Sequence, residues 1–307
     1  MLVTQSFWWG AAYVFIAIAL RAFAPAQVVT LRTGLAAAAL LAFALVTGAA
    51  ARGALDEIRR RPGRVTVFAF VGSAAPFLLI AWGQKHVPAG LTGVLVASVP
   101  LWTALLALRL DRREVIDRRQ WTGLLVGLVG VALVVGVDGF ESPAQVVGVL
   151  AILLAAGAYA LTNFMVTAWY QDVPAVTRSL FTTGGAALLT LPPAVAASST
   201  GPIGWEPVLA VVLLGVGSTS IAATLGFKLV TEIGAGRAAL ATYIGPGFSL
   251  GLGAVFLGET ITAGAVAGLG LIIAGVVVAS GRRRTAAGSA ATGAPIRAAR
   301  LAPAPRA

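Results

Sequence analysis

The chain has 307 residues, of which 58% are hydrophobic and only 11% are charged. Soluble domains carry roughly 25% charged residues, so this composition would expose large apolar patches in water. It therefore excludes an ordinary soluble protein and predicts one that is embedded in a lipid bilayer.

The net charge of +11 could indicate a nucleic-acid partner, but the positions of the basic residues argue against one. Of the 22 Lys and Arg residues, five lie in residues 52–64, five in 109–119 and six in 282–307. Basic clusters beside apolar runs are typical of positive-inside sorting in membrane proteins, with some attraction to anionic lipid. The expected macromolecular environment is the bilayer, without nucleic acid.

The sequence has no cysteine and one histidine, His86. This excludes disulfides, thiolate chemistry and metal sites built from cysteines or several histidines. No P-loop motif is present either, so direct use of ATP is not expected. We expect no metal and no cofactor.

The chain begins with an apolar run that ends in Ala22-Phe23-Ala24, a triplet resembling a signal-peptidase site. A basic segment before the run is missing and Pro25 follows the triplet directly, so we expect a retained first span. A helix that crosses the hydrocarbon takes ~20 residues. Apolar runs of about this length predict ten transmembrane helices, at residues 3–21, 26–50, 65–84, 89–108, 121–138, 144–168, 174–197, 207–229, 235–257 and 261–280.

The loops set the expected orientation. With ten spans, both termini share one side with the loops after spans two and four, and these segments carry the basic clusters. The loop after span five contains Asp138 and Glu141, has no basic residue and should lie opposite. We therefore expect a multi-pass protein of the cell (plasma) membrane with both termini in the cytoplasm. Residues 282–307, rich in Ala, Arg, Gly and Pro, predict a disordered cytoplasmic tail.

The second half of the sequence repeats features of the first at an offset of 145 or 146 residues. The recurring pairs are Tyr13 and Tyr159, Gly72-Ser73 and Gly217-Ser218, Ala89-Gly90 and Ala235-Gly236, Pro100 and Pro246, and Glu114 and Glu259. Two domains of five spans, residues 1–140 and 141–281, follow from this repeat. Since five is odd, the second domain must enter the membrane from the opposite side.

The predicted fold class is therefore all-α integral membrane, with ten transmembrane helices in two inverted five-helix repeats around a central cavity. Inverted repeats are an architecture of secondary transporters, whose substrate site lies near the midplane between the halves. The repeat thus predicts a transporter of a small molecule, and the oligomeric state stays open.

Several short motifs resemble the EamA module. The first half has Trp9-Gly10, Pro25 with Arg32, and Ala89-Gly90 followed by Pro100, and the second half has Ala235-Gly236, Pro246 and Gly258-Glu259. Residues 5–280 are thus similar to a transporter of the drug/metabolite transporter superfamily, made of two EamA modules. The resemblance implies ten helices, a central cavity, and in many members export of amino acids, other metabolites or toxic compounds.

The second half departs from this pattern in two places. It has Ala156-Gly157 in place of the Trp-Gly pair, and Arg178 lies closer to Pro174 than Arg32 lies to Pro25. The role of Arg32 is therefore not carried over to Arg178.

Arg32 is the most informative single residue, because it lies about two turns into the second predicted span. A charge at that depth costs several kcal/mol unless it faces protein or water. Arg32 could line the cavity and bind an anionic group such as a substrate carboxylate. It could instead be structural, bonded to helix-end carbonyls or extended to the external headgroups.

Other polar-tipped or aromatic side chains lie within aliphatic spans and are candidates for the cavity wall. They are Tyr13, Trp82, Trp102, Tyr159, Asn163 and Tyr243. The alternative for these residues is hydrogen bonding between helices or, for Trp82, a place in the interfacial aromatic belt.

Pro100 and Pro246 occupy matching places inside spans four and nine. Proline removes a backbone hydrogen bond and kinks a helix, so both are candidate hinges for alternating access or static kinks that shape the cavity. Glu114 and Glu259 lie at matching span junctions and predict helix capping or closure of a tight loop. Glycine faces on spans five and ten predict close helix packing.

The expected function is secondary transport, with export of a small organic metabolite such as an amino acid, a related compound or a drug-like molecule by alternating access. A membrane-embedded enzyme is an alternative, but it would need paired carboxylates, histidines or a metal site at one face. A channel or a scaffold without transport is a third possibility, which the inverted repeat disfavours. The substrate, direction and coupling ion are left open.

Overall fold

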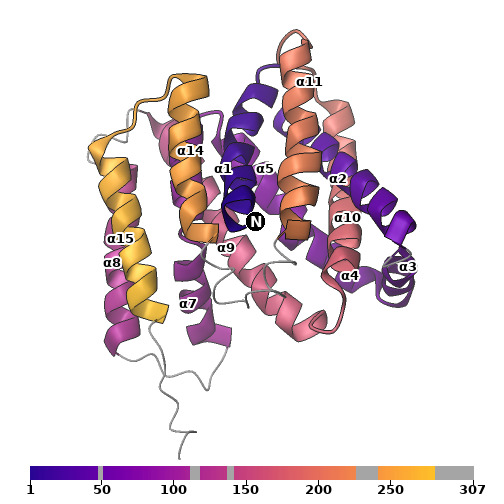
Figure 1. The fold of residues 1–307 in the computed structure, drawn as a ribbon, viewed down its shortest axis with the longest axis horizontal. Coiled ribbons are helices and arrows are strands. Elements are labelled where there is room, and N and C mark those ends of the chain that lie inside the picture. Colours follow the sequence, from indigo (N-terminus) through magenta and orange to yellow (C-terminus); the bar gives the residue numbers. More distant parts are fainter. Residues whose placement is uncertain (48–50, 111–117, 137–141, 226–240, 281–307) are drawn as a thin grey trace, which may run out of the picture.

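A computed structural model describes residues 1–47, 51–110, 118–136, 142–225 and 241–280 (Figure 1). All regular elements in these residues are helical, as predicted. In chain order they are α1 (Leu2–Ala19), α2 (Pro25–Thr47), α3 (Ala51–Arg60), α4 (Pro62–Ala69), η1 (Phe70–Ala74), α5 (Ala75–Gly83), α6 (Ala89–Val96), α7 (Val99–Leu110), α8 (Arg118–Val135), α9 (Pro143–Trp169), α10 (Ala175–Ala196), α11 (Trp205–Val212), η2 (Leu213–Ile221), α14 (Ala241–Leu257) and α15 (Ala263–Ser280). The predicted tail, Glu114 and Ala235-Gly236 lie outside the described residues.

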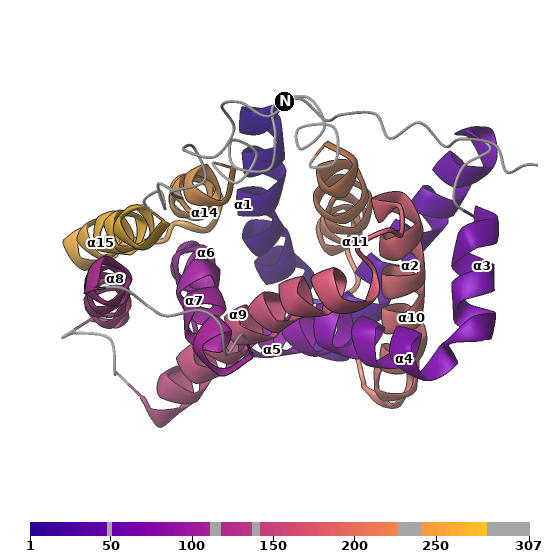
Figure 2. The same cartoon turned by 90° about the horizontal axis from the view of Figure 1, so that it is seen from below.

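Seven helical stretches of the described chain are long and apolar enough to cross a membrane, and some join two or three of these elements. Three shorter apolar helices, Trp121–Val134, Tyr243–Leu257 and Ala263–Val278, lie where the sequence predicts spans five, nine and ten. The short helix α3 lies in the basic segment after the second span, where no element was predicted, and it stands at the edge of the molecule (Figure 2).

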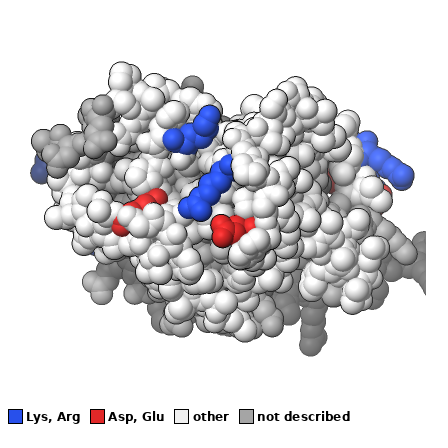
Figure 3. Space-filling view, turned by 90° about the horizontal axis from the view of Figure 1, so that it is seen from above, with Lys and Arg blue, Asp and Glu red and all other residues white. Residues whose placement is uncertain are grey.

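The outer surface exposes many large apolar side chains, which would be unfavourable in water. Val46 is 88% exposed, Val255 76% and Phe256 65%. The face seen from above carries charged side chains in only a few separate places (Figure 3). A surface of this kind requires lipid as its solvent, so the protein is a multi-pass membrane protein.

The π-helical segments η1 and η2 occupy corresponding positions in the two halves. Each contains one copy of the repeated Gly-Ser pair, Gly72-Ser73 in η1 and Gly217-Ser218 in η2. A π-helical turn adds a residue to the helix, and such turns are often found at functional sites. The repeated Gly-Ser pair therefore lies in a π-helical segment in both halves.

Helices from the two halves that share a repeat position run antiparallel where they pack. In the pair α2 and α10, the Gln27 side chain donates to the Ala197 carbonyl at 2.9 Å, and Thr30 bonds to Thr190 at 2.8 Å. Moving along α2 from Gln27 to Thr30, the contacted residue moves back along the chain from Ala197 to Thr190, so the two helices run in opposite directions. The same reversal occurs in α8 with α15 and in α6 with α14.

Glycine allows α8 and α15 to meet backbone to backbone, as the glycine faces predict. A Cβ on Gly275 would lie 2.5 Å from both the Gly123 carbonyl oxygen and the Gly127 nitrogen, and one on Gly130 would lie 2.8 Å from the Gly268 carbonyl oxygen. Real Cβ atoms do not approach backbone this closely, so these glycines determine the separation of the two helices.

Glu259, at the junction of α14 and α15, caps a helix of the other half. Its carboxylate accepts hydrogen bonds from the backbone N–H groups of Ala89, at 2.6 Å, and Gly90, at 2.8 Å, which begin α6. Both N–H groups would otherwise lack a partner, and the negative charge is favourable at a helix N-terminus. The predicted capping role of Glu259 is confirmed, and the structure adds that the cap joins the two halves.

We expect Gly275→Ala to destabilise the protein by about 1–3 kcal/mol, because backbone atoms of α8 would have to move away from the added methyl group. Gly270→Ala is the matched control, since Gly270 is on the same helix with no atom within 4 Å of its Cβ position. The control should be neutral or slightly stabilising, as alanine favours helix over glycine. Denaturation of the purified protein, followed by tryptophan fluorescence, measures both. Equal effects at the two positions would contradict the close contact.

Glu259→Ala should lower the free energy of unfolding by about 2–4 kcal/mol, because two hydrogen bonds to a charged group are lost. Glu206→Ala is its control: Glu206 is an exposed carboxylate in the first turn of α11 and should change the free energy by less than about 1 kcal/mol. The same denaturation experiment compares them, and a Glu259 variant as stable as the control would show that the cap contributes nothing.

Candidate substrate-binding site

A cavity of about 460 Å³ lies between the two halves of the chain. Its wall is built from α1, α2, α5 and the α6–α7 segment of the first half and from α9, η2 and α14 of the second. Most of the wall is apolar, with a few polar groups, a composition typical of small-molecule sites of this size. The structure therefore contains a cavity between the two halves, where the sequence predicts a central cavity.

Arg32 projects from α2 into this cavity and is only 6% exposed. Its guanidinium lies 3.8 Å from the centre of the Phe77 ring, and one of its terminal nitrogens donates to the Thr219 hydroxyl at 3.1 Å. The Thr219 hydroxyl in turn donates to the Leu214 carbonyl, at 2.9 Å, which fixes its oxygen as an acceptor. Arg32 is thus held in place by a ring face and a neutral hydroxyl.

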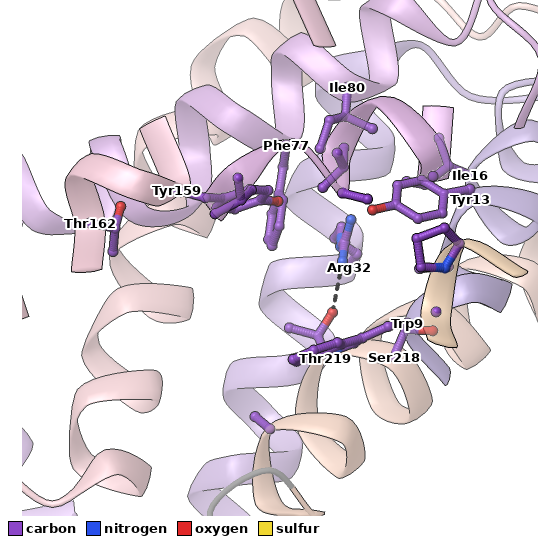
Figure 4. Close-up of a pocket in the computed structure, with 18 of the residues that line it drawn as sticks. Trp9, Tyr13, Ile16, Arg32, Phe77, Ile80, Tyr159, Thr162, Ser218 and Thr219 are labelled. Atoms are coloured by element: carbon purple, nitrogen blue, oxygen red, sulfur yellow. Dashed lines mark hydrogen bonds between the residues drawn. The ribbon is translucent and has the colours of Figure 1, made fainter. Parts of the chain in front are cut away.

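Tyr13 and Tyr159, the pair related by the sequence repeat, lie on opposite sides of Arg32 with their hydroxyl groups directed toward it (Figure 4). The Arg32 Nε, which is buried, has no hydrogen-bond partner, and the same is true of the Ser218 hydroxyl in η2. Buried polar atoms without partners are uncommon and call for a ligand or water. Both unpartnered atoms belong to residues that line the cavity.

The helical segment formed by α6 and α7, which contributes to the cavity wall, is interrupted between the two helices. Helix α6 ends at Val96, α7 begins at Val99, and Ala97 and Ser98 between them form a turn. Pro100 has no N–H to donate to the Val96 carbonyl, and both residues line the cavity. Pro246 lines the opposite wall within the continuous helix α14. The two prolines therefore differ: Pro100 accompanies a break and Pro246 does not.

The described residues of the cavity wall differ in exposure from one part of the wall to another. Trp9, nearer the N-terminus of α1, is 36% exposed, and Asn163 near the end of α9 is also exposed. Ile16, two turns further along α1, and Ile80 on α5 are each 2% exposed and belong to a tightly packed apolar cluster. The described wall is therefore more tightly packed around Ile16 and Ile80 than around Trp9 and Asn163.

The structure brings six of the nine predicted site residues to the cavity wall. They are Tyr13, Arg32, Pro100, Tyr159, Asn163 and Pro246. The described wall does not include Trp82, whose ring packs at 5.4 Å from that of His86, or Trp102, which lies against Gly157. Tyr243 packs instead on the apolar cluster around α8 and α15.

The repeat-related arginine, Arg178, has a different environment from Arg32. It donates to the carbonyls of Tyr170, at 3.3 Å, and Val173, at 3.5 Å, beyond the end of α9. These carbonyls follow a helix C-terminus, where a cation is favourable. Arg178 therefore binds carbonyls beyond a helix end and is not part of the described cavity wall.

The sequence pattern of the EamA-like transporter family matches residues 1–136 and again residues 146–281. The chain belongs to the EamA-like transporter family. Two copies of the pattern in one chain agree with the sequence repeat and leave the last residues, from 282, unmatched.

Two relatives of this EamA-like transporter carry transporter names. The "Uncharacterized transporter YdfC" of Bacillus subtilis (strain 168) is 28% identical over 262 residues, which are 83% of this chain and 81% of the relative. The "Probable terminal-alkyne amino-acid exporter" of Streptantibioticus cattleyicolor is 28% identical over 256 residues, 80% of this chain and 84% of the relative. Family and relatives identify a membrane transporter and do not point to an enzyme.

A protein of known crystal structure shares the fold of this EamA-like transporter, with a TM-score of 0.65 over 90% of this chain and 95% of the other. The two sequences are 23% identical. At this identity, the similarity supports the same fold and nothing about function.

Three residues at the site of this EamA-like transporter were not predicted as site residues: Phe77, whose ring contacts Arg32, and Ser218 and Thr219, which contribute hydroxyl groups. A signal for the hydroxyls existed in the sequence, because residues 216–220 form an unusually small and polar run in an apolar span. Phe77 carried no signal, since one phenylalanine in an apolar helix resembles any other.

We expect Arg32→Met to leave the stability of the empty protein equal to wild type or up to about 1 kcal/mol higher, because it removes a buried charge that has no carboxylate partner in the described structure. Arg178→Met is the matched control and should destabilise, since it leaves helix-end carbonyls without their donor. Thermal unfolding in detergent measures both. A loss of more than about 2 kcal/mol in the Arg32 variant would identify a structural arginine.

Proposed function

We propose that the protein is a secondary transporter that exports a small organic metabolite, an amino acid or a related compound, by alternating access. The observation that carries the proposal is the cavity between the two family modules, which contains a buried arginine and unpartnered polar atoms. A cavity at such an interface is where secondary transporters bind their substrates. The name of the Streptantibioticus relative supports the class of solute.

The proposal includes ten spans arranged as two inverted five-helix domains, residues 1–140 and 141–281. Antiparallel packing of α2 with α10, α6 with α14 and α8 with α15 supports this, since matched helices of inverted repeats run in opposite directions. The packing pairs also correspond between the halves: the contact of α2 with η2 matches that of α10 with η1, and the contact of α1 with η2 matches that of α9 with η1. A two-fold arrangement explains this correspondence.

In this proposal Arg32 binds the substrate carboxylate, with Tyr13, Tyr159 and Asn163 completing the polar wall. A guanidinium is suited to this role because its planar N–H groups match the two oxygens of a carboxylate. Trp82, Trp102 and Tyr243 are second-rank candidates, which would reach the substrate only in another conformation. No described residue provides the paired acids of a membrane-embedded enzyme at the cavity wall.

We propose that the cavity loads from the side on which α1 begins, where Trp9 is partly exposed, and that this side is the cytoplasm of a cell (plasma) membrane. The structure then corresponds to a state that loads from inside. Alternating access would close this side and separate α6 from α14 at the other, with the break beside Pro100 and the proline of α14, Pro246, as hinges.

Counterflow in proteoliposomes tests the transport function. Vesicles loaded with an unlabelled amino-acid mixture should accumulate a labelled amino acid transiently and saturably, which neither a pore nor a scaffold does. Arg32→Gln should lower the initial rate at least about tenfold if the arginine contacts the carboxylate. Arg21→Gln, which changes an exposed arginine between α1 and α2, is the control and should leave the rate unchanged. Absence of counterflow for all labelled amino acids and related acids would refute the function.

The inverted arrangement has its own test, because the sequence contains no cysteine. Arg21→Cys and Asp172→Cys introduce single thiols into exposed, corresponding loops, after α1 and after α9. A membrane-impermeant maleimide applied to intact cells should label the first variant and should label the second only after the cells are opened. Labelling of both from the same side would contradict inversion.

A further inference from the structure

We infer that the cavity selects solutes with one net negative charge, that is monocarboxylates with an apolar or aromatic body, over zwitterions and cations of the same shape. The inference rests on the proposed function and, within its class of amino acids and related compounds, favours the related acids that lack the ammonium group. It starts from the charge of the cavity wall: Arg32 is the only charged side chain among the described residues that line it.

The charge of Arg32 is not balanced by any described neighbour. Its partners are the Phe77 ring and the Thr219 hydroxyl, which are both neutral. The ion pair found in the described structure, between Arg61 and Glu57, lies elsewhere, in and just after α3. Since an arginine side chain stays protonated in proteins, the empty cavity carries one positive charge in apolar surroundings.

The three classes of solute leave different charges in the occupied cavity. A monocarboxylate neutralises Arg32, a zwitterion leaves the site with one net positive charge, and a cation raises the total to two. In an α-amino acid, the ammonium group is one carbon away from the carboxylate and would lie close to the guanidinium. Repulsion at such a distance is strong where water is excluded, so it opposes the gain from the carboxylate pair.

The hydrogen-bonding groups near Arg32 favour the same class. A carboxylate accepts several hydrogen bonds, and the Arg32 Nε and the hydroxyls of Tyr13 and Tyr159 can donate to it from three directions (Figure 4). An ammonium group needs acceptors, and the described wall offers neutral ones, such as the Asn163 amide. A hydrogen bond between the Arg32 guanidinium and a carboxylate, in which both partners are charged, is stronger than one between an ammonium group and a neutral amide oxygen.

The rest of the wall is suited to the body of the solute. Ile16 and Ile80 form a tightly packed part of the cavity wall, and Val96 and the rings of Trp9 and Phe77 contribute further apolar surface. A ring or branched alkyl group would bury its surface there without leaving a polar group unpaired. Aromatic and branched-chain monocarboxylates, such as 2-oxo acids, combine both requirements.

Three probes that share a phenylethyl unit test the inference: 3-phenylpropanoate, which carries only the carboxylate, phenylalanine, which is a zwitterion, and 2-phenylethylamine, which carries only the ammonium group. Their dissociation constants are measured by titration calorimetry with the purified full chain. We expect 3-phenylpropanoate to bind at least about tenfold more tightly than phenylalanine, and the amine to bind most weakly. This ranking is measured on the wild-type protein and does not depend on the folding of any variant.

Two variants test whether the charge of Arg32 causes this order of affinities. Arg32→Gln should bring the three dissociation constants within about threefold of one another, because the charge that separates them is gone. Asn163→Asp, which is nearly isosteric, places an acid on the wall and should improve phenylalanine binding relative to 3-phenylpropanoate. An unchanged ranking in Arg32→Gln would refute the assignment to Arg32.

Phenylalanine binding equal to or tighter than that of 3-phenylpropanoate would overturn the inference, and so would the absence of 3-phenylpropanoate binding at 10 mM, which is roughly the weak limit of a specific site. Neither result bears on transport itself, because counterflow is measured separately. Saturable counterflow of phenylalanine together with its tighter binding would retain the transporter and reject the preference for monoanions.

Discussion

Helices of the two halves meet backbone to backbone where glycine leaves no side chain between them, and the position of the cavity depends on these contacts. At the α8–α15 contact, Gly130 and Gly275 approach backbone atoms of the other helix, and no bulky residue could replace them without moving a helix. Next to this pair, the carboxylate of Glu259, which follows α14, binds the first N–H groups of α6. The halves are thus held together around an interior that they do not fill.

The unfilled interior has an unusual electrostatic character for a lipid-embedded protein. A cation is normally kept out of such a region or paired with an acid, yet Arg32 is supported by an aromatic face and neutral hydroxyl groups. These contacts fix the position of the guanidinium without cancelling its charge. A site of this kind keeps much of its attraction for a carboxylate available for binding and discriminates by net charge as well as by shape.

The repeat does not make the two halves chemically equivalent. Arg32 faces the cavity, whereas Arg178 binds carbonyls beyond a helix end. Trp9 lines the wall, whereas the corresponding place in the second half has small residues, Ala156-Gly157, with Gly157 lying against Trp102. The backbone framework is duplicated, and side-chain differences between the copies leave Arg32 as the one charged side chain among the described residues of the cavity wall.

The amino-acid sequence by itself determined that the chain lies in a membrane, where its apolar spans lie and that it contains two related halves, because span length, composition and repeat offset are properties read along the chain. It also identified Arg32, Tyr13 and Tyr159 as candidates, since charge and polar tips are rare and costly in apolar helices. Which candidates share one cavity was decided only by the tertiary structure. Phe77, Thr219 and Trp102 illustrate the reason: whether a side chain faces the cavity, another helix or lipid depends on helix rotation and on contacts between residues far apart in sequence.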